Sequence, residues 1–227
     1  KGGGLGGGGD AESASAVLAM GSLPVADDEG VTLLHSAAER GLTRTVEALI
    51  SKSADVNARS RSGETPLLAA CQAGSVETAV QLLNAMADFK LQDGQGQSPL
   101  HWAVQKRSAD LSLILLQRGA SPNLQDIMKR TPMHWACQEP GMAEIVRAAV
   151  ESHGADLAIG SQGGDTPLHW ACKAGNSACV EYLVGLEAVD VGAVNIAGEK
   201  PSDVCSRDAD KKLVEEAASK KKVWCSC

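Results

Sequence analysis

Aromatic residues are scarce in this chain, which has one Tyr, one Phe and four Trp among 227 residues. It also contains no run of about 18 apolar residues, which excludes a helix that spans a membrane. Acidic residues outnumber basic ones by 28 to 21, giving a formal net charge of -7. Because affinity for nucleic acids comes mostly from Lys and Arg that neutralise phosphates, we expect no nucleic-acid partner.

A paired cysteine framework is missing as well. Seven Cys is an odd number, which fits a reducing compartment better than a secreted disulfide scaffold. We therefore predict a cytoplasmic or nuclear protein. No signal peptide can be recognised, and the chain begins at Lys1 instead of Met, as we expect of a fragment or a processed product. What the chain does have is 44% apolar residues, enough for a sizeable core.

One pattern recurs along the chain at nearly constant spacing. Its first residues stand 33, 33, 33, 35 and 34 positions apart, at Gly30, Gly63, Gly96, Lys129, Gly164 and Gly198. Each block contains Thr-Pro or a variant of it, then a short apolar stretch with small residues, a breaker and a second apolar-periodic run. One such unit cannot bury its apolar face alone, so the pattern predicts stacked neighbours that share a core.

The block at residues 164–169, Gly-Asp-Thr-Pro-Leu-His, and closing segments such as Ala54-Asp55-Val56-Asn57 resemble the ankyrin repeat. The resemblance implies an all-α ankyrin-repeat solenoid of helix-turn-helix units with β-turn or hairpin loops. We predict about five full repeats with a partial repeat at each end. The boundaries are a Gly-rich flexible linker at 1–10, a half repeat at 11–26, repeats at 27–59, 60–92, 93–125, 126–160 and 161–194, a degraded capping repeat at 195–219, and a basic Cys-x-Cys tail at 220–227.

The Thr or Ser of each block is placed to begin the first helix of its unit. Its side-chain oxygen can cap the helix, and Pro is well tolerated in a first turn. The resemblance implies that the His three residues later is structural, with a ring nitrogen bonded to the turn of the same or the next unit. One His per unit is too widely spaced to share a metal ion, so we predict no metal site. The residues assigned to the turns are Thr65, Thr131, Thr166, His35, His101, His134 and His169.

Cys71, Cys137 and Cys172 share one small position of the first helix, where other units have Ala38 and Val104. Buried Cys behaves as a small hydrophobe and is usually inert. The chain has no Gly-rich phosphate loop, no Gly-x-Ser-x-Gly elbow and no His-Glu-x-x-His motif. We therefore predict neither catalysis nor a cofactor.

The resemblance implies a partner protein or peptide bound on the concave face, built from turn tips and the exposed side of the first helices. Three Trp share one position in consecutive units, where Leu is usual in the family. They either fill space between first helices, which we favour, or form an aromatic ridge for a partner. The candidate partner-binding residues are Trp102, Trp135, Trp170, Arg61, Glu64, Gln72, Gln95, Gln97, Gln105, Lys106, Met128, Arg130, Gln138, Asp165 and Lys173.

We thus predict a monomeric, non-catalytic scaffold or adaptor. The alternative is the targeting or regulatory part of a larger enzyme whose catalytic part lies outside this chain. The ending, a Lys run followed by Cys225 and Cys227, has three interpretations. It is an ordinary solvated tail, which we favour; a lipidated Cys-x-Cys end that attaches the protein peripherally to a membrane; or the start of a zinc module.

Overall fold

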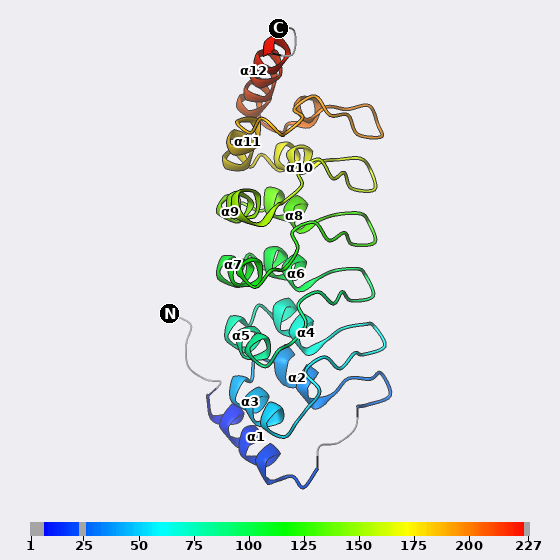
Figure 1. Cartoon of the computed structure of the whole chain (residues 1–227), viewed down its shortest axis with the longest axis vertical. Helices are drawn as coiled ribbons and strands as arrows, with labels where there is room; N and C mark the ends of the chain where they lie inside the picture. The colour runs from blue at the N-terminus through cyan, green and yellow to red at the C-terminus, as the bar shows by residue number, and fades with distance from the viewer. Residues whose placement is uncertain (1–6, 23–25, 225–227) are drawn as a thin grey trace. The chain divides into compact units, whose positions relative to one another are not determined.

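The computed structural model describes residues 7–22 and 26–224, and within these residues the regular secondary structure is helical, without strands. Helices come in pairs, and each pair is followed by a loop that leads to the next (Figure 1). The fold is an all-α repeat solenoid, as predicted. The chain divides into two compact units, Lys1–Leu111 and Ser112–Cys227.

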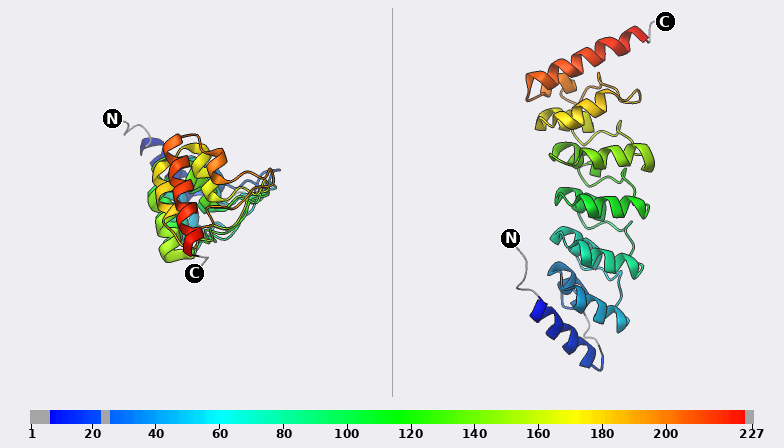
Figure 2. Two further views of the ribbon diagram at one scale, coloured as in Figure 1. Left: turned by 90° about the horizontal axis from the view of Figure 1, so that it is seen from above. Right: turned by 90° about the vertical axis from the view of Figure 1, so that its left-hand side faces the viewer.

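The first unit opens with a single helix that is followed by helix pairs. Helix α1 (Gly7–Ala19) packs on α3 (Thr43–Ser51), the second helix of the pair that begins with α2 (Leu33–Glu39). The next pair is α4 (Pro66–Ala73) and α5 (Val76–Asn84), and α6 (Pro99–Gln105) follows. First helices contact first helices, α2 with α4 and α4 with α6, and the second helix α3 contacts α5. The right-hand view of Figure 2 shows α3 and α5 one above the other.

The division between the units falls within α7 (Ala109–Gln117). The second unit continues with α8 (Pro132–Gln138), α9 (Ala143–His153), α10 (Pro167–Ala174) and α11 (Ser177–Val184). Here too α8 contacts α10 and α9 contacts α11. The unit ends with a short 3-10 helix, η1 (Pro201–Val204), and with α12 (Asp208–Trp224), which packs on α11 and η1.

The first helices begin where the sequence predicts. Pro occupies the first turn of α4, α6, α8 and α10, and an extended Thr or Ser precedes each of these helices. The Oγ1 of Thr65 accepts a hydrogen bond from the backbone N–H of Leu68 at 3.3 Å, and Ser98 caps α6 in the same way through the N–H of His101. Each such cap satisfies an N–H that has no partner within the helix.

Small residues let neighbouring first helices approach closely. The position predicted to be small and buried is fully buried in all five repeats, as Ala38, Cys71, Val104, Cys137 and Cys172. The preceding residue is a buried Ala in each repeat, and Leu or Met fills the second position of every first helix. Burying a large apolar side chain contributes roughly 1.5–3 kcal/mol, so each buried Leu or Met of this shared core stabilises its repeat by about that amount.

The longer fourth repeat accommodates its two extra residues at element ends, as predicted. Helix α9 has 11 residues, whereas α3 and α5 have 9 each. The other extra residue lies in the connection that follows Gln138, where Gly141 adopts a φ of 87°. Insertions at these places leave the contacts between first helices intact.

The predicted linker at 1–10 is wrong at its carboxyl end, because α1 already begins at Gly7. Asp10 explains the longer helix. Its carboxylate accepts hydrogen bonds from the backbone N–H groups of Arg44 and Thr45 at 3.0 and 2.9 Å, and from the Thr45 hydroxyl at 2.7 Å. These bonds tie the first turn of α1 to the start of α3 and offset the low helix propensity of glycine. Residues 1–6 lie outside the described residues.

The predicted boundary at 219 is also wrong, because α12 continues to Trp224. The Nζ of Lys221 donates hydrogen bonds to the carbonyl oxygens of Leu186 and Val189, at 2.6 and 2.7 Å. This pairing of a cation with carbonyl groups holds the helix against the loop that follows α11. Cys225 and Cys227, the residues of the lipidation and zinc hypotheses, lie outside the described residues.

Candidate partner-binding site

A hairpin-like turn precedes each first helix, and in four repeats and the capping repeat a polar side chain accepts hydrogen bonds from the backbone of this turn. In three repeats this residue is Asp27, Asp93 or Asp126, and its Oδ1 accepts two backbone N–H groups from the following four residues. Ser60 and Asn195 occupy the same position and each accept one such bond. The turns are therefore fixed before any partner binds.

In the first unit, the turn also holds the indole of Trp102. Its Nε1–H donates to the Oδ2 of Asp93 at 3.0 Å, and the side chain is half-buried. The same aspartate therefore binds the turn through one oxygen and the aromatic side chain through the other. This contact supports the structural interpretation of Trp102.

In the second unit, Trp135 and Trp170 lie against each other in an edge-to-face arrangement, with ring centroids 5.5 Å apart and planes at 68°. The guanidinium of Arg130 stands 4.6 Å from the centroid of the Trp135 ring and binds Asp126 at 2.7 Å. Such aromatic and cation–π contacts contribute about 0.5–1.5 kcal/mol each. Both Trp rings are half-buried, so they take part in packing and still reach the surface.

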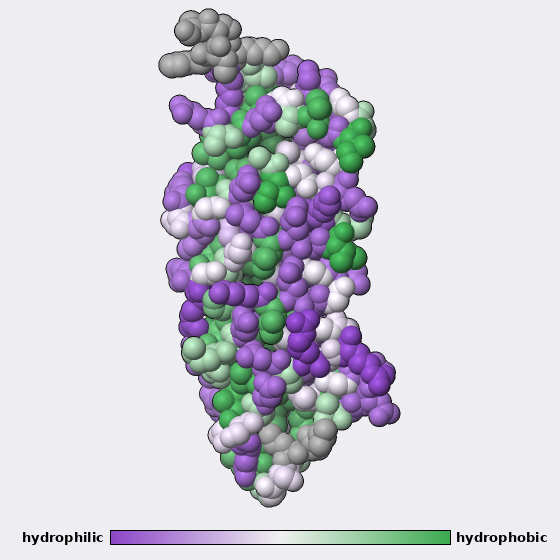
Figure 3. All heavy atoms as spheres, turned by 45° about the vertical axis from the view of Figure 1, so that its right-hand side comes forward, coloured by the Kyte–Doolittle hydropathy of each residue, from purple (hydrophilic) through white to green (hydrophobic). Residues whose placement is uncertain are grey.

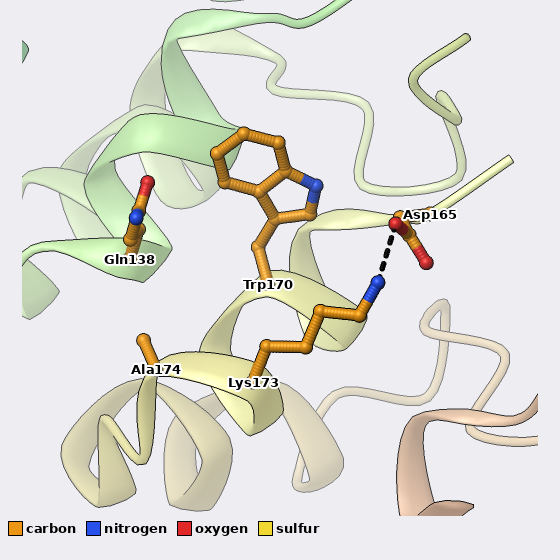
Figure 4. Close-up of a pocket in the computed structure, with 5 residues that line it drawn as sticks. All are labelled: Gln138, Asp165, Trp170, Lys173 and Ala174. Carbon is orange, nitrogen blue, oxygen red and sulfur yellow. Dashed lines mark hydrogen bonds and ion pairs between the residues drawn. The ribbon is translucent and has the colours of Figure 1, made fainter. Parts of the chain in front are cut away.

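A pocket of about 270 Å³ lies beside Trp170, lined by Gln138 at the end of α8 and by Asp165, Trp170, Lys173 and Ala174 (Figure 4). The Nζ of Lys173 donates to the Oδ2 of Asp165 at 2.7 Å, and the Nδ2 of Asn195 donates to its Oδ1 at 2.8 Å. Burial opposes ionisation of Asp165, but these two bonds prevail and lower the pKa of its carboxyl below the ordinary value. Asp165 is thus a carboxylate whose two oxygens are both bound.

The four His side chains form hydrogen bonds with the turns that precede the first helices. In the second unit, the Nδ1 of His134 accepts the backbone N–H of Thr131 at 3.0 Å, so Nε2 carries the hydrogen and donates to the carbonyl of Asp165 at 2.9 Å. His35 and His169 are bonded in the same way, and burial lowers the pKa of both rings. His101 accepts the N–H of Ser98 at 3.1 Å. The rings of His35, His134 and His169 thus bridge one repeat to the next, and His101 binds its own turn.

The structure divides the predicted partner-binding residues into three groups. Exposed side chains belong to Arg61, Gln95, Lys106, Met128, Gln138 and Lys173. Half-buried ones belong to Glu64, Gln72, Trp102, Gln105, Arg130, Trp135, Asp165 and Trp170. Gln97 is wrong as a surface candidate, because it is only 7% exposed. Gln97 follows the turn glycine, and its side chain folds inward. Arg130 and Asp165 occupy the same position in their repeats, and each binds a residue of its own repeat.

The first unit has a different charge pattern at the equivalent place. Burial raises the pKa of Glu64, and the nearby carboxylates of Glu39 and Asp93 raise it further. Arg61 pairs with Glu29 at 3.1 Å, and both side chains are mostly exposed. An exposed pair of this kind contributes little to stability, so these charges shape the surface more than the fold.

Sequence reasoning missed several residues of this region. Asn195 donates a hydrogen bond to Asp165. It occupies, in the degraded capping repeat, the position of Asp93 and Asp126, so a comparison of that position across the repeats could have identified it. Sequence reasoning also missed the apolar side chains of Val194 and Ile196, which are 58% and 80% exposed. Ile127, which the sequence places at a turn tip with Met128, is 59% exposed, and Met128 is 45% exposed. In Figure 3 hydrophobic spheres stand among hydrophilic ones along the hairpins of the second unit, in the upper half of the view.

Other chemistry is not apparent in the described part of the chain. Among those residues, no three His, Cys, Asp or Glu side chains are grouped so that they could hold a metal ion. Burial raises the pKa of the Cys71 and Cys172 thiols, which makes them poor nucleophiles. No helix within residues 7–22 and 26–224 combines the length and apolar character needed to cross a bilayer.

Comparison with known families agrees with the geometry. The family model described as ankyrin repeats (3 copies) matches residues 34–126 and 100–195, which together cover more than half of the chain. No curated protein matches the chain significantly. Ankyrin repeats are generally non-catalytic modules of protein–protein interaction. With its Thr-Pro caps, bridging His and stacked helix pairs, this chain belongs to the ankyrin-repeat family.

Proposed function

We propose that this protein is a scaffold or adaptor that binds a partner protein or peptide through a surface we call the hairpin face. In the second unit this face consists of Met128, Gln138, Trp170 and Lys173, which lie on a hairpin and on the outward side of two first helices. The observation that carries the proposal is the half-buried Trp135–Trp170 pair beside an open pocket. Trp is enriched at interface hot spots because it buries a large area.

Affinity purification with the full chain tests this proposal. Gln138→Arg changes an exposed residue of the hairpin face, and Glu144→Arg changes an exposed residue at the start of α9, a second helix. We expect partners captured by the wild type to be lost with Gln138→Arg and kept with Glu144→Arg. Trp135→Ala, checked for folding by circular dichroism, should lose the same partners. Recovery that depends on Glu144 and not on Gln138 or Trp135 would contradict the proposal.

A further inference from the structure

The pocket beside Trp170 is a preformed feature of the second unit. Trp170 is fixed by edge contacts to Trp135 and to His134, whose ring centroid lies 5.6 Å away at an interplanar angle of 80°. Asp165 is fixed by Lys173 and Asn195. A partner group that enters this pocket meets walls already in place, which reduces the entropy lost on binding.

The size of the pocket indicates one side chain of a larger partner. Its volume of about 270 Å³ lies below the range of roughly 300–1,000 Å³ typical of sites for free small molecules. In Figure 4 the space lies between Gln138 and the Lys173–Ala174 end of α10, with the indole of Trp170 above it. A single large side chain therefore fits better than a free cofactor.

Charge complementarity selects a neutral occupant. The ammonium of Lys173 and the carboxylate of Asp165 are bonded at 2.7 Å, so the charged walls sum to zero. A charged group would gain no net attraction from this pair, and it would have to compete with the bond between Lys173 and Asp165. The indole face, the methylene groups of Lys173 and the methyl group of Ala174 supply apolar contact instead.

The polar atoms at the rim suit a peptide backbone. Lys173 uses one N–H for Asp165, and its ammonium carries three. The amide of Gln138 stands on the opposite side of the space (Figure 4). These groups can donate to backbone carbonyls on either side of an inserted side chain.

The hairpins next to the pocket extend the apolar surface. Asn195, bonded to Asp165, is followed by the exposed Ile196, whose N–H donates to the carbonyl of Gly163 at 2.9 Å. On the other side, the carbonyl of Met128 accepts the N–H of Gln162 at 2.8 Å. Ile127 and Met128 therefore lie on the hairpin before the one that carries Asp165, and Ile196 lies on the hairpin after it.

The equivalent positions of the first two repeats lack this chemistry. Ala69 replaces Trp170, and Glu39, Glu64, Gln72 and Ala73 replace Gln138, Asp165, Lys173 and Ala174. The neutral ion pair thus becomes two carboxylates with a Gln, and the aromatic wall is gone. The first two repeats therefore supply a matched control for the chemistry of this pocket.

We propose that the Trp170 pocket is an anchor site for one large uncharged side chain, aliphatic or aromatic, presented by an extended segment of a partner protein. The neighbouring residues of that segment lie along the apolar hairpins. This inference rests on the proposed function and names the partner chemistry that the hairpin face accepts.

A phage-displayed library of random linear peptides, selected on the full chain, provides the probe. We expect the enriched peptides to share a Leu, Met, Phe, Tyr or Trp, and replacement of that residue by Ala to weaken binding at least about tenfold in fluorescence anisotropy. Ala174→Met, which fills the pocket from an exposed position, should weaken binding of the same peptides at least about tenfold. Ala73→Met, at the equivalent exposed position of α4, should leave it unchanged.

The outcomes separate the two proposals. Peptides that share only charged residues, or that bind Ala174→Met as well as the wild type, would overturn the anchor site while leaving the proposed function intact. A library that yields no binder would count against both. Because Trp170→Ala removes a packed ring, Trp170→Phe is measured beside it: we expect Phe to restore binding that Ala abolishes, and equal binding by both variants would refute a role for the ring.

Discussion

Replacing His169 by Leu should lower the free energy of unfolding by about 3 kcal/mol. The ring makes three hydrogen bonds: Nδ1 accepts from the N–H and the Oγ1–H of Thr166 at 3.1 and 2.9 Å, and Nε2 donates to the carbonyl of Glu199 at 3.1 Å. Each such bond contributes about 1 kcal/mol net. Leu is accommodated at this position, since Leu68 occupies it in the second repeat and is buried there. The decrease in the free energy of unfolding would therefore come from the lost hydrogen bonds and not from a cavity.

Denaturant unfolding, followed by circular dichroism at about pH 7.5 and about pH 5.5, measures this loss and its pH dependence. Burial lowers the pKa of His169 below 6.5, its ordinary value, so the unfolded chain binds more protons than the folded one as the pH falls through 6.5. The wild type should therefore be less stable at the lower pH, and His169→Leu should show a smaller decrease.

His153→Leu is the matched control, because His153 lies at the end of α9, outside the bridging position. It should change the stability by less than about 0.5 kcal/mol. A His169→Leu variant as stable as the wild type, or one with an unchanged pH dependence, would refute the argument that this ring bridges the last repeat and the cap.

Three further predictions concern the helix caps, the turns and the core. Asp10→Ala should destabilise the chain by about 1–2 kcal/mol in denaturant unfolding, because α3 loses its cap. Gly164→Ala should cost about 2 kcal/mol in the same assay, because Gly164 has a φ of +77° and an added Cβ would stand 2.9 Å from the backbone N of Ile196. In the folded chain, Cys71 should resist alkylation by iodoacetamide at mildly alkaline pH, measured by mass spectrometry, because burial raises the pKa of its thiol.

Each of these predictions has a control. Glu12→Ala, on the same helix as Asp10, should leave stability nearly unchanged, and an equal loss in both variants would contradict the capping role. Gly163→Ala places its Cβ no closer than 3.8 Å to another residue, so it should cost less than Gly164→Ala. Cys71 should be labelled fully in denaturant, and equally fast labelling of the folded chain would contradict its burial.

Interactions that are local in the chain could be predicted from the sequence. The Thr or Ser cap and the Pro of the first turn act within one helical turn, so they predict the start of each first helix from the sequence alone. The role of the His three residues later is implied by the resemblance to the ankyrin repeat. The small residues Cys71, Cys137 and Cys172 could be placed in the core, because they share a position with Ala38 in the other units. Because the repeats of one chain can be aligned with each other, such positions can be identified without an alignment of related proteins.

The ends of the solenoid could not be predicted in this way. From the sequence we predict that residues 7–10 belong to a glycine linker and that residues 220–224 form a basic tail. Both segments are helical. The stabilising partners are distant in sequence: Asp10 bonds to Arg44 and Thr45, and Lys221 bonds to Leu186 and Val189. Terminal helices lack a neighbour on one side, so their length depends on such contacts more than on local propensity.

The sequence by itself determined the ankyrin-repeat family, the order of the repeats, the helix caps and the identity of the core positions, because these depend on neighbours within a few residues and recur in each unit. Only the tertiary structure decided that Gln97 turns inward, that Trp135 and Trp170 touch, and that Lys173 neutralises Asp165 beside an open pocket. These features join residues 8 to 35 positions apart, and their chemistry depends on which side chains adjacent repeats bring together.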